Sequence, residues 1–219
     1  MIIAIDGPSG SGKTTLGRML AHALKLLYID TGSMYRAVAL AVIDAEIDPR
    51  DKDAVSALAD EIEIDLRGDP DSLSVLLNGY DVTNQIRTEK VTEMSSVVST
   101  IPGVRRAMVA RQRAIGKRGA VLNGRDIGTV VFPDADVKFF LTAGPEERAE
   151  RRYKEDQMTA ASSATFAETL SDINERDRRD SSRADSPLKV ADDAIVIDST
   201  GKNIDEVFEE MVSHVHRNH

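Results

Sequence analysis

The sequence predicts an α/β fold in which helices cover both faces of a parallel sheet. Five short apolar runs indicate buried strands, and segments with helical periodicity separate them. In residues 16–24 and again in residues 204–215, apolar side chains recur with the spacing of one helical face. Strands that alternate with helices form parallel sheets that are buried on both faces. The expected strands are residues 2–5, 27–29, 120–122, 137–141 and 194–197.

A second, antiparallel element is predicted within residues 62–82. This segment begins with apolar residues that alternate with charged ones, a period of two that is typical of a half-exposed strand. Asn78-Gly79 then lies between two strand-like runs, which is the strongest short signal for a hairpin. We therefore expect a small β-meander inserted into the α/β core, with helices following over residues 88–99 and 102–115. The chain would then divide into a core of residues 1–61 and 100–219 and an insert of residues 62–99.

The composition limits the classes of partner. The chain has 219 residues, enough for one core with an insert or for two small domains. Its formal net charge is −9 and its isoelectric point is near 5.0, so we expect no nucleic-acid polymer as partner. Aromatic residues make up only 4% and Trp is absent, which disfavours base-stacking platforms. The absence of cysteine excludes disulfides and thiolate metal sites.

The apolar runs of the sequence also predict where in the cell the protein is located. No apolar run approaches the roughly 18 residues of a membrane span. The first strand-like run begins at Ile2, which leaves no room before it for a signal peptide. We therefore expect a cytoplasmic protein without a membrane partner. No sequence feature demands a dimer, and we expect a monomer.

Residues 7–15, GPSGSGKTT, form a phosphate-binding motif. They match the P-loop pattern G-x-x-x-x-G-K-[ST], and the required buried strand and amphipathic helix flank it. The glycines let backbone N–H groups turn toward a phosphate, and the helix adds the positive end of its dipole. Lys13 would reach the β- and γ-phosphates of ATP, and the hydroxyl of Thr14 would bind Mg²⁺. The predicted ATP-binding residues are Gly7, Pro8, Ser9, Gly10, Ser11, Gly12, Lys13, Thr14 and Thr15.

The P-loop alone does not identify the acceptor of the phosphate. A GTPase is disfavoured because the guanine-reading N-K-x-D is absent, and DLRG at 65–68 falls in the meander. A motor ATPase is disfavoured because Asp198, the acid that ends the last apolar run, comes after the other four strands. A small-molecule kinase instead needs cations that face the P-loop from a second anion site. The chain fits that class, because 13 of its 19 arginines lie between Arg105 and Arg183.

Three stretches are candidates for the second anion site. DTGSMYR (30–36) and NGRDIGTVVFPDA (123–135) each follow a predicted strand, at the edge where α/β proteins bind ligands. ERDRRDSSR (175–183) spaces Arg176, Asp180 and Arg183 so that they share one face of a helix.

Each stretch also has a purely structural interpretation. The first could be a helix start capped by Thr31 or Ser33, and the second a tight turn. The third could be a solvated helix with internal salt bridges. A P-loop on the same sheet favours the functional interpretation of all three.

Together these stretches resemble bacterial cytidylate kinases, which phosphorylate CMP and dCMP. The similarity runs essentially end to end, over IDGPSGSGKTT, IDTGSMYRAVAL, NQIRTEKV, NGRDIGTVVFPDA, ERDRRDSSRADSPL and DSTGKNIDEV. It implies a P-loop kinase fold with a five-stranded parallel sheet, the meander as a monophosphate-binding insert, and a lid at about residues 151–168. The small polar loop at 159–169 is the candidate lid tip. The implied activity is Mg²⁺-dependent transfer of the γ-phosphate of ATP to CMP or dCMP.

The resemblance also implies site residues. The catalytic residues would be Lys13, Arg125, Asp126 and Arg176, with charge added from the lid by Arg148, Arg151 and Arg152. The CMP-binding residues would be Ser9, Asp30, Thr31, Tyr35, Arg36, Ser96, Arg105, Arg125, Asp126, Arg176, Asp180 and Arg183. Position 123 departs from the family pattern, because Asn stands here where the family carries an acid.

The chemistry of cytosine agrees with these assignments. Its amino group is a donor that suits the carboxylate of Asp126, and its N3 and O2 are acceptors that suit Ser96 or arginine. Uracil would present the opposite edge to Asp126. Two alternatives stay open at this point: a kinase for another small acceptor, such as another nucleoside monophosphate or shikimate, and a regulatory P-loop protein that needs no acceptor.

Overall fold

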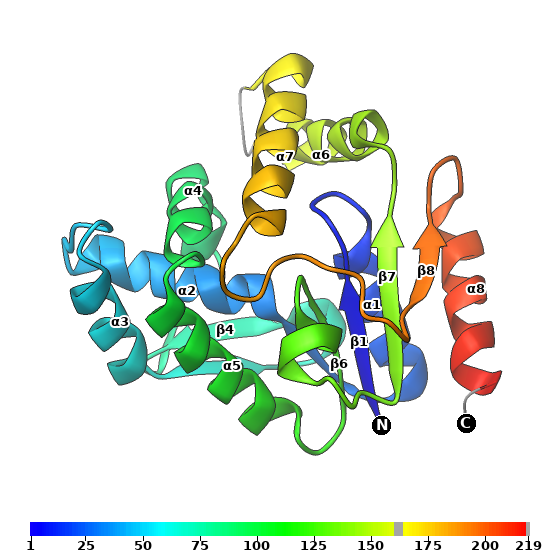
Figure 1. The fold of residues 1–219 in the computed structure, drawn as a ribbon, viewed down its shortest axis with the longest axis horizontal. Coiled ribbons are helices and arrows are strands. Elements are labelled where there is room, and N and C mark those ends of the chain that lie inside the picture. The colour runs from blue at the N-terminus through cyan, green and yellow to red at the C-terminus, as the bar shows by residue number, and fades with distance from the viewer. Residues whose placement is uncertain (160–163, 218–219) are drawn as a thin grey trace.

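The centre of the molecule is a five-stranded parallel sheet. The computed structural model describes residues 1–159 and 164–217. The strands are β1 (Ile2–Asp6), β2 (Leu27–Asp30), β6 (Ala120–Gly124), β7 (Val137–Thr142) and β8 (Ile195–Asp198), in the order β2-β6-β1-β7-β8 (Figure 1). Every neighbouring pair is parallel. Each strand overlaps one of the expected apolar runs, and the predicted α/β fold class is confirmed.

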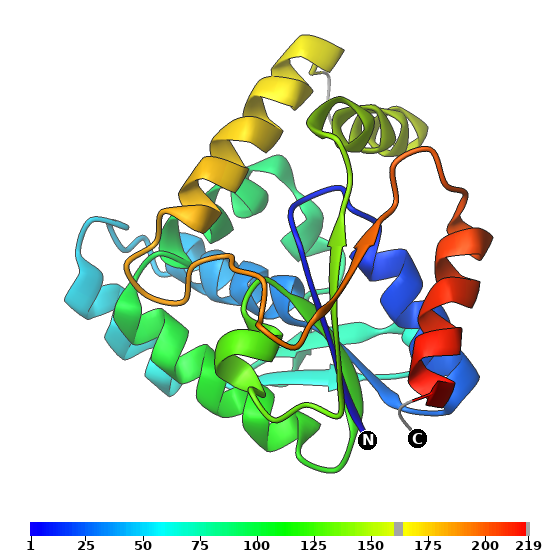
Figure 2. The same cartoon turned by 45° about the vertical axis from the view of Figure 1, so that its right-hand side comes forward.

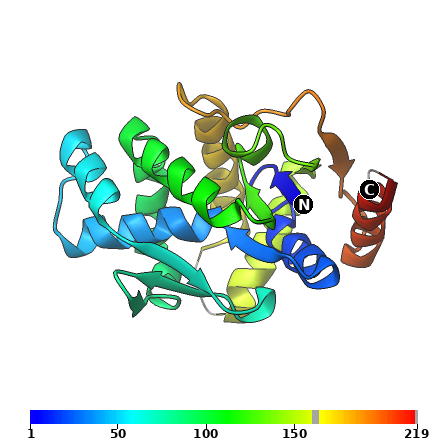
Figure 3. The same ribbon diagram turned by 90° about the horizontal axis from the view of Figure 1, so that it is seen from below.

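Successive residues of β1 point into two different cores. Ile3 and Ile5 pack with the apolar stripes of α1 (Lys13–Leu24) and α8 (Ile204–Arg217) on one face of the sheet. Ala4 packs on the other face with α2 (Thr31–Asp44) and α5 (Pro102–Gly116). This alternation is expected for a parallel strand that is buried on both faces. In the view of Figure 3, α8 and α3 (Lys52–Glu61) lie at opposite ends of the molecule.

The predicted meander is also confirmed. Strands β3 (Ile64–Arg67), β4 (Ser74–Leu77) and β5 (Tyr80–Asp81) form a separate antiparallel sheet. Asn78 and Gly79 have φ of 50° and 83°, the left-handed pair that a two-residue hairpin turn requires. Two short helical turns, η1 (Pro70–Ser72) and η2 (Gln85–Arg87), border the sheet, and α4 (Glu89–Val98) follows.

The spacing of apolar residues does not predict helix α2. Ten of its fourteen residues are buried, so its sequence shows no polar face from which a helical period could be recognised. Its first turn is capped by neither Thr31 nor Ser33, contrary to the structural interpretation above. The carboxylate of Asp30 is the cap and accepts a hydrogen bond from the Gly32 N–H at 3.1 Å.

Two helices stand above the carboxyl ends of β1 and β7 in Figure 1. They are α6 (Pro145–Thr159) and α7 (Phe166–Ser181). The expected polar loop at 159–169 is therefore too long at both ends, and residues 160–163 of it lie outside the described residues. Thr165 and Glu168 form a reciprocal capping box that starts α7, which explains why helix begins inside the small polar stretch.

The helix α7 ends before Arg183, so that residue does not share the helical face of Arg176 and Asp180 as the spacing suggested. Residues 182–194 then run to β8 without a helix or strand (Figure 2). None of the described helices is long and apolar enough to cross a membrane.

Candidate active site

The phosphate-binding loop joins β1 to α1. Gly7, Gly10 and Gly12 have φ of 146°, 76° and 89°, conformations that side chains rarely adopt. A Cβ on Gly7 would lie 2.0 Å from the carbonyl oxygen of Leu141, and one on Gly10 would lie 2.8 Å from that of Arg148. The loop therefore needs glycine both for its turn and for its close packing against the sheet and α6.

Lys13 is folded back onto its own loop. Its ammonium donates to the carbonyl of Pro8 and to the hydroxyl of Ser11, the latter at 3.2 Å. Burial, together with the charges of Arg125 and Arg176, lowers the pKa of Lys13 well below its ordinary value. The structure thus brings the P-loop lysine into the field of arginines that lie 112 and 163 positions later in the sequence.

Asp6 ties the P-loop strand to the segment after NGRD. Its two carboxylate oxygens accept hydrogen bonds from the N–H groups of Ile127 and Gly128, both at 2.8 Å. These residues begin a π-helical turn, η3 (Ile127–Val131). Burial raises the pKa of Asp6 to about 6 despite these two donors. The motif patterns did not single out Asp6, because its role depends on a contact 121 residues away.

The stretch 30–36 contributes one ion pair and one hydrogen bond to the backbone of β6. Arg36 lies 3.1 Å from the carboxylate of Asp30. The hydroxyl of Thr31 donates to the carbonyl of Asn123 at 2.7 Å, which fixes the start of α2 to the end of β6. Tyr35 is buried, with the guanidinium of Arg105 5.5 Å from its ring centroid.

Two further ion pairs hold the residues of NGRD. Arg125 lies 2.7 Å from Asp180, which also pairs with Arg183. Burial alone would raise the pKa of Asp180, but Arg125, Arg183 and Arg176 outweigh it and hold that pKa below its ordinary value. Asp126 pairs with Arg105, and the two side chains are only 6% and 4% exposed.

The insert contacts α7 and the residues just after it through serine hydroxyls. Ser96 accepts a hydrogen bond from Arg179 at 2.6 Å, and Ser99 accepts one from Arg183 at 3.4 Å. Arg179 was absent from the predicted site, although it lies within the stretch ERDRRDSSR. Its position in a run of charges gave no sign of which arginine would reach the insert.

Arg176 differs from its neighbours because it forms no ion pair with any residue that the structure describes. Its enclosure and the nearby charge of Arg125 lower its pKa to about 10, so it stays positively charged at neutral pH. A charged, half-buried guanidinium that makes no direct ion pair is suited to receive an anionic ligand.

The three lid-side arginines lie in different environments. Arg148 is buried, donates to the Ser9 carbonyl at 3.0 Å and lies 2.7 Å from Asp177 of α7. Arg151 instead bonds the Ser199 carbonyl at 2.7 Å, beyond the end of β8. Arg152 lies 3.0 Å from Asp156 on its own helix. Only Arg148 therefore contacts the P-loop directly.

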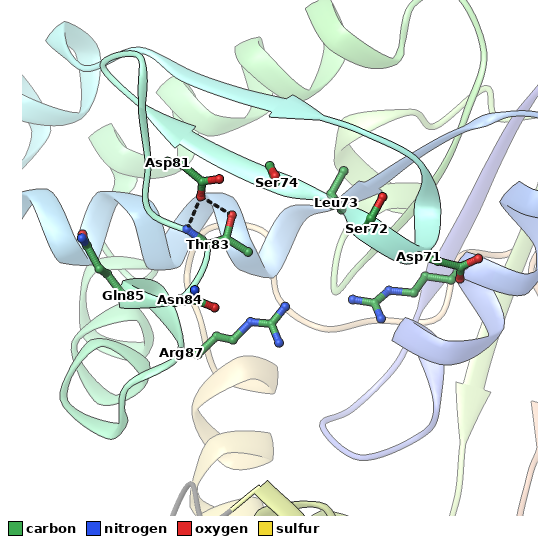
Figure 4. A pocket seen from close by; sticks show the side chains of 10 residues that line it. Asp71, Ser72, Leu73, Ser74, Asp81, Thr83, Asn84, Gln85 and Arg87 are labelled. Atoms are coloured by element: carbon green, nitrogen blue, oxygen red, sulfur yellow. Dashed lines mark hydrogen bonds between the residues drawn. The ribbon is translucent and has the colours of Figure 1, made fainter.

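A polar cavity of about 510 Å³ lies between the insert and α1 (Figure 4). It contains Arg18 and Arg87 together with Asp71 and Asp81, so its formal charges balance. The carboxylate of Asp81 is already bonded to the N–H and the hydroxyl of Thr83. None of the predicted site residues lines this cavity. This cavity is therefore not the second anion site that the sequence predicted.

The described residues contain no group of three or more His, Cys, Asp or Glu side chains that could hold a metal ion. The predicted arrangement is that Mg²⁺ arrives with ATP and is held at the hydroxyl of Thr14. The hydroxyl of Thr14 fits that arrangement, because Thr14 is exposed at the start of α1 and the amide of Asn123 donates to it at 3.3 Å.

The fold and these contacts define a P-loop phosphotransferase in which the charges of Arg125 and Arg176 act on the lysine of the loop. A family model described as cytidylate kinase matches residues 3–217. The chain therefore belongs to the cytidylate kinase family, and the resemblance stated from the sequence is confirmed.

Individual relatives agree over nearly the whole chain. A cytidylate kinase of Geobacter sp. (strain M21) is 48% identical over 96% of this chain and 91% of its own. One of Solibacter usitatus is 50% identical over 95% of this chain and 89% of its own. One of Halalkalibacterium halodurans is 46% identical over 98% and 97%.

A solved structure agrees in fold alone. An uncharacterized protein from Eubacterium ventriosum ATCC 27560 superposes with a TM-score of 0.53 at 12% identity. The superposition covers 99% of this chain and 98% of the other.

Proposed function

We propose that this chain transfers the γ-phosphoryl group of ATP to CMP or dCMP, giving ADP and CDP or dCDP. The observation that carries the proposal is that the positive charges of Arg125 and Arg176 act on the buried Lys13 of the P-loop. Two anionic substrates repel each other, so a kinase with a phosphate acceptor needs cations between its two sites. Membership in the cytidylate kinase family supports cytidylate as the acceptor.

The donor, ATP, would bind to the P-loop, residues 7–15. Lys13 would leave the carbonyl of Pro8 and donate to the β- and γ-phosphates. Thr14 would help to hold Mg²⁺, which would supply positive charge to neutralise the phosphates. Arg148 would keep the loop in place through the Ser9 carbonyl.

The acceptor phosphate would lie against Ser9, Arg36 and Arg125, with Arg176 and Asp180 at the ribose. Asp30 and Asp180 already hold the arginines Arg36 and Arg125 in their rotamers. Such preformed ion pairs reduce the ordering that the acceptor would otherwise have to impose. Thr31 and Tyr35 would form the wall of the acceptor site.

The base would be read by Asp126, with Ser96, Arg105 and Arg183 around it. The ion pair with Arg105 keeps Asp126 available as an acceptor for the cytosine amino group. Uracil has the O4 acceptor where cytosine has this amino donor, so the carboxylate of Asp126 would lose a hydrogen bond, at a cost on the order of 1–3 kcal/mol. This supports discrimination of CMP from UMP by roughly 10- to 100-fold.

The transfer needs no proton movement at the acceptor. A CMP phosphate oxygen, already anionic, would attack the γ-phosphorus in line, and the bond to the β-phosphate oxygen of ADP would break. Lys13, Arg125 and Arg176 would balance the charge that spreads over the transferred group.

We also propose roles for two further parts of the chain, an insert and a lid. Residues 62–99 would act as a monophosphate-binding insert on a core of residues 1–61 and 100–219. A lid at about 151–168, a range that includes the end of α6 and the start of α7, would close over ATP to exclude water.

An acceptor panel tests this function. ADP formation would be measured from Mg·ATP with CMP, dCMP, UMP, AMP and shikimate, and we expect fast turnover with CMP and dCMP. Background rates for both, alongside a fast rate with another acceptor, would refute the assignment. ADP formation that needs no acceptor would identify a P-loop NTPase instead.

The base-reading role has its own test. Asp126→Asn replaces one acceptor oxygen with a donor, so kcat/KM should fall more for CMP than for UMP. Equal losses with the two nucleotides would remove this role from Asp126.

A further inference from the structure

The cavity between the insert and α1 has no part in the proposed phosphoryl transfer. Its lining comes from both sides: Arg18 belongs to α1, and Asn84, Gln85 and Arg87 belong to the motif NQIRTEKV of the insert. In Figure 4 the side chain of Arg87 extends from the ribbon into the space between them. A volume of about 510 Å³ is typical of small-molecule sites. The cavity is therefore a candidate ligand site that the core and the insert share.

The two arginines of this cavity have no ion-pair partners. Among the residues that the structure describes, neither Arg18 nor Arg87 forms an ion pair or a hydrogen bond through its side chain. The Nε of Arg18 is also buried. Its guanidinium lies 6.0 Å from the ring centroid of Tyr28, a contact that supplies no hydrogen-bond acceptor for Nε. A buried donor without an acceptor is costly, which indicates that a ligand satisfies it in another state.

The two carboxylates of the cavity do not pair with these arginines. One oxygen of Asp81 accepts from both the N–H and the hydroxyl of Thr83, at 2.9 and 2.6 Å. The side chain of Asp71 is 75% exposed, and its carboxylate lies 3.9 Å from the ring of His22. The formal charges of the cavity therefore balance without direct contact between them, and both guanidinium groups remain available to an anionic ligand.

Two neutral donors accompany the arginines. The hydroxyl of Ser72 and the amide of Asn84 line the cavity, and neither side chain makes a hydrogen bond to a described residue. A phosphate group presents three acceptor oxygens and carries a charge of about −2 at neutral pH. It matches two guanidinium groups in charge and accepts hydrogen bonds from several directions, whereas a carboxylate carries one charge on two oxygens. This set of donors therefore favours a phosphate group.

We propose that this cavity binds a phosphate group between Arg18 and Arg87, at a site separate from the P-loop. None of residues 7–15 lines it. The ligand is inorganic phosphate or a small phosphorylated compound, since both present the same group. A phosphate group alone fills only part of about 510 Å³, which leaves room for a compact substituent such as a pentose. The bound ligand joins the insert to α1, the helix that begins at Lys13.

Calorimetric titration of the full chain with sodium phosphate, at an ionic strength held constant with NaCl, measures this binding. The chains compared all carry Lys13→Met, because a P-loop binds phosphate as well. We expect Arg18→Gln and Arg87→Gln each to weaken phosphate binding at least about tenfold, as the loss of one charge-assisted hydrogen bond predicts. Acetate should bind at least about tenfold more weakly than phosphate. Titration with ribose 5-phosphate distinguishes the two sources, because the tighter binder shows whether the site prefers a free or an esterified phosphate.

Arg67→Gln is the matched control, because Arg67 is an exposed arginine of the insert that pairs with Asp65 and does not line the cavity. Circular dichroism checks each fold. Crystals of the unaltered chain soaked in tungstate, a heavy analogue of phosphate, locate the anion independently of any variant. Equal phosphate binding in Arg18→Gln, Arg87→Gln and the control, equal binding of acetate, or tungstate at the P-loop alone would overturn the proposal. The titrations contain no ATP or CMP, so either result leaves the proposed function standing.

Discussion

The buried ion pair between Arg105 and Asp126 makes a strong prediction about stability. Asp126→Asn keeps the size of the side chain but removes its charge, which leaves the guanidinium of Arg105 buried with the Ser99 carbonyl at 3.2 Å. Breaking a buried pair by removing one partner costs about 3–5 kcal/mol. For a chain of this length each kcal/mol shifts Tm by about 2–4 °C, so we expect a loss of roughly 6–20 °C.

Thermal unfolding followed by circular dichroism measures this loss. Asp65→Asn is the matched control, because Asp65 forms its pair with Arg67 at the surface and should change Tm little. The double variant Asp126→Asn/Arg105→Met removes both charges and should lose clearly less than the sum of the two single variants. If the single losses simply add, or if Asp126→Asn matches the surface control, the two groups are not coupled and the argument from burial is wrong.

Three other predictions concern the P-loop and its strand. Gly7→Ala should prevent normal folding, because its Cβ would lie 2.0 Å from the Leu141 carbonyl, whereas Gly144→Ala meets open space; soluble yield and Tm compare the two. Lys13→Met should lower kcat by at least about 100-fold with an unchanged circular dichroism spectrum, since it removes charge from the transferred group; near-normal turnover would contradict this. Asp6 has a pKa of about 6 when folded and an ordinary value of 3.8, so the folded state binds more protons between these pH values. The contribution of Asp6 to the free energy of unfolding should therefore fall by about 3 kcal/mol as the pH rises from 3.8 to about 6 and stay level above that pH. Urea unfolding at pH 4 to 7 measures the free energy of unfolding. That of the unaltered chain should fall relative to that of Asp6→Asn as the pH rises. A constant difference between the two would contradict the raised pKa of Asp6.

The parts of the fold that the sequence predicted share one property: their signal is local. Five apolar runs gave the parallel strands, Asn78-Gly79 gave the hairpin, and GPSGSGKTT gave the loop between β1 and α1. For α2 the sequence offered only a possible helix start at residues 30–36, because burial on nearly all sides leaves no polar face to show the helical period. The polar stretch 159–169 was overextended as a loop because small polar residues also cap helices, as Thr165 does.

The candidate site also has parts that the sequence predicted and parts that it did not. The resemblance supplied the residue types and their positions, including Arg125, Asp126 and Arg176. It did not reveal Arg179 on Ser96, Asp6 beneath η3, or Arg148 on the P-loop, because each of these contacts joins segments that are far apart in the sequence.

The sequence by itself determined the fold class, the phosphate-binding loop and the family, because each depends on patterns within a few residues or on motifs that are specific to one family. The tertiary structure alone decided which carboxylate neutralises which arginine. Arg125 and Asp180 are 55 positions apart, and Arg105 and Asp126 are 21 apart. The packing of α5 and α7 around the end of β6 brings these charges together. Among the described residues, it leaves Arg176 without a direct ion pair and the Oδ1 of Asn123 without a donor.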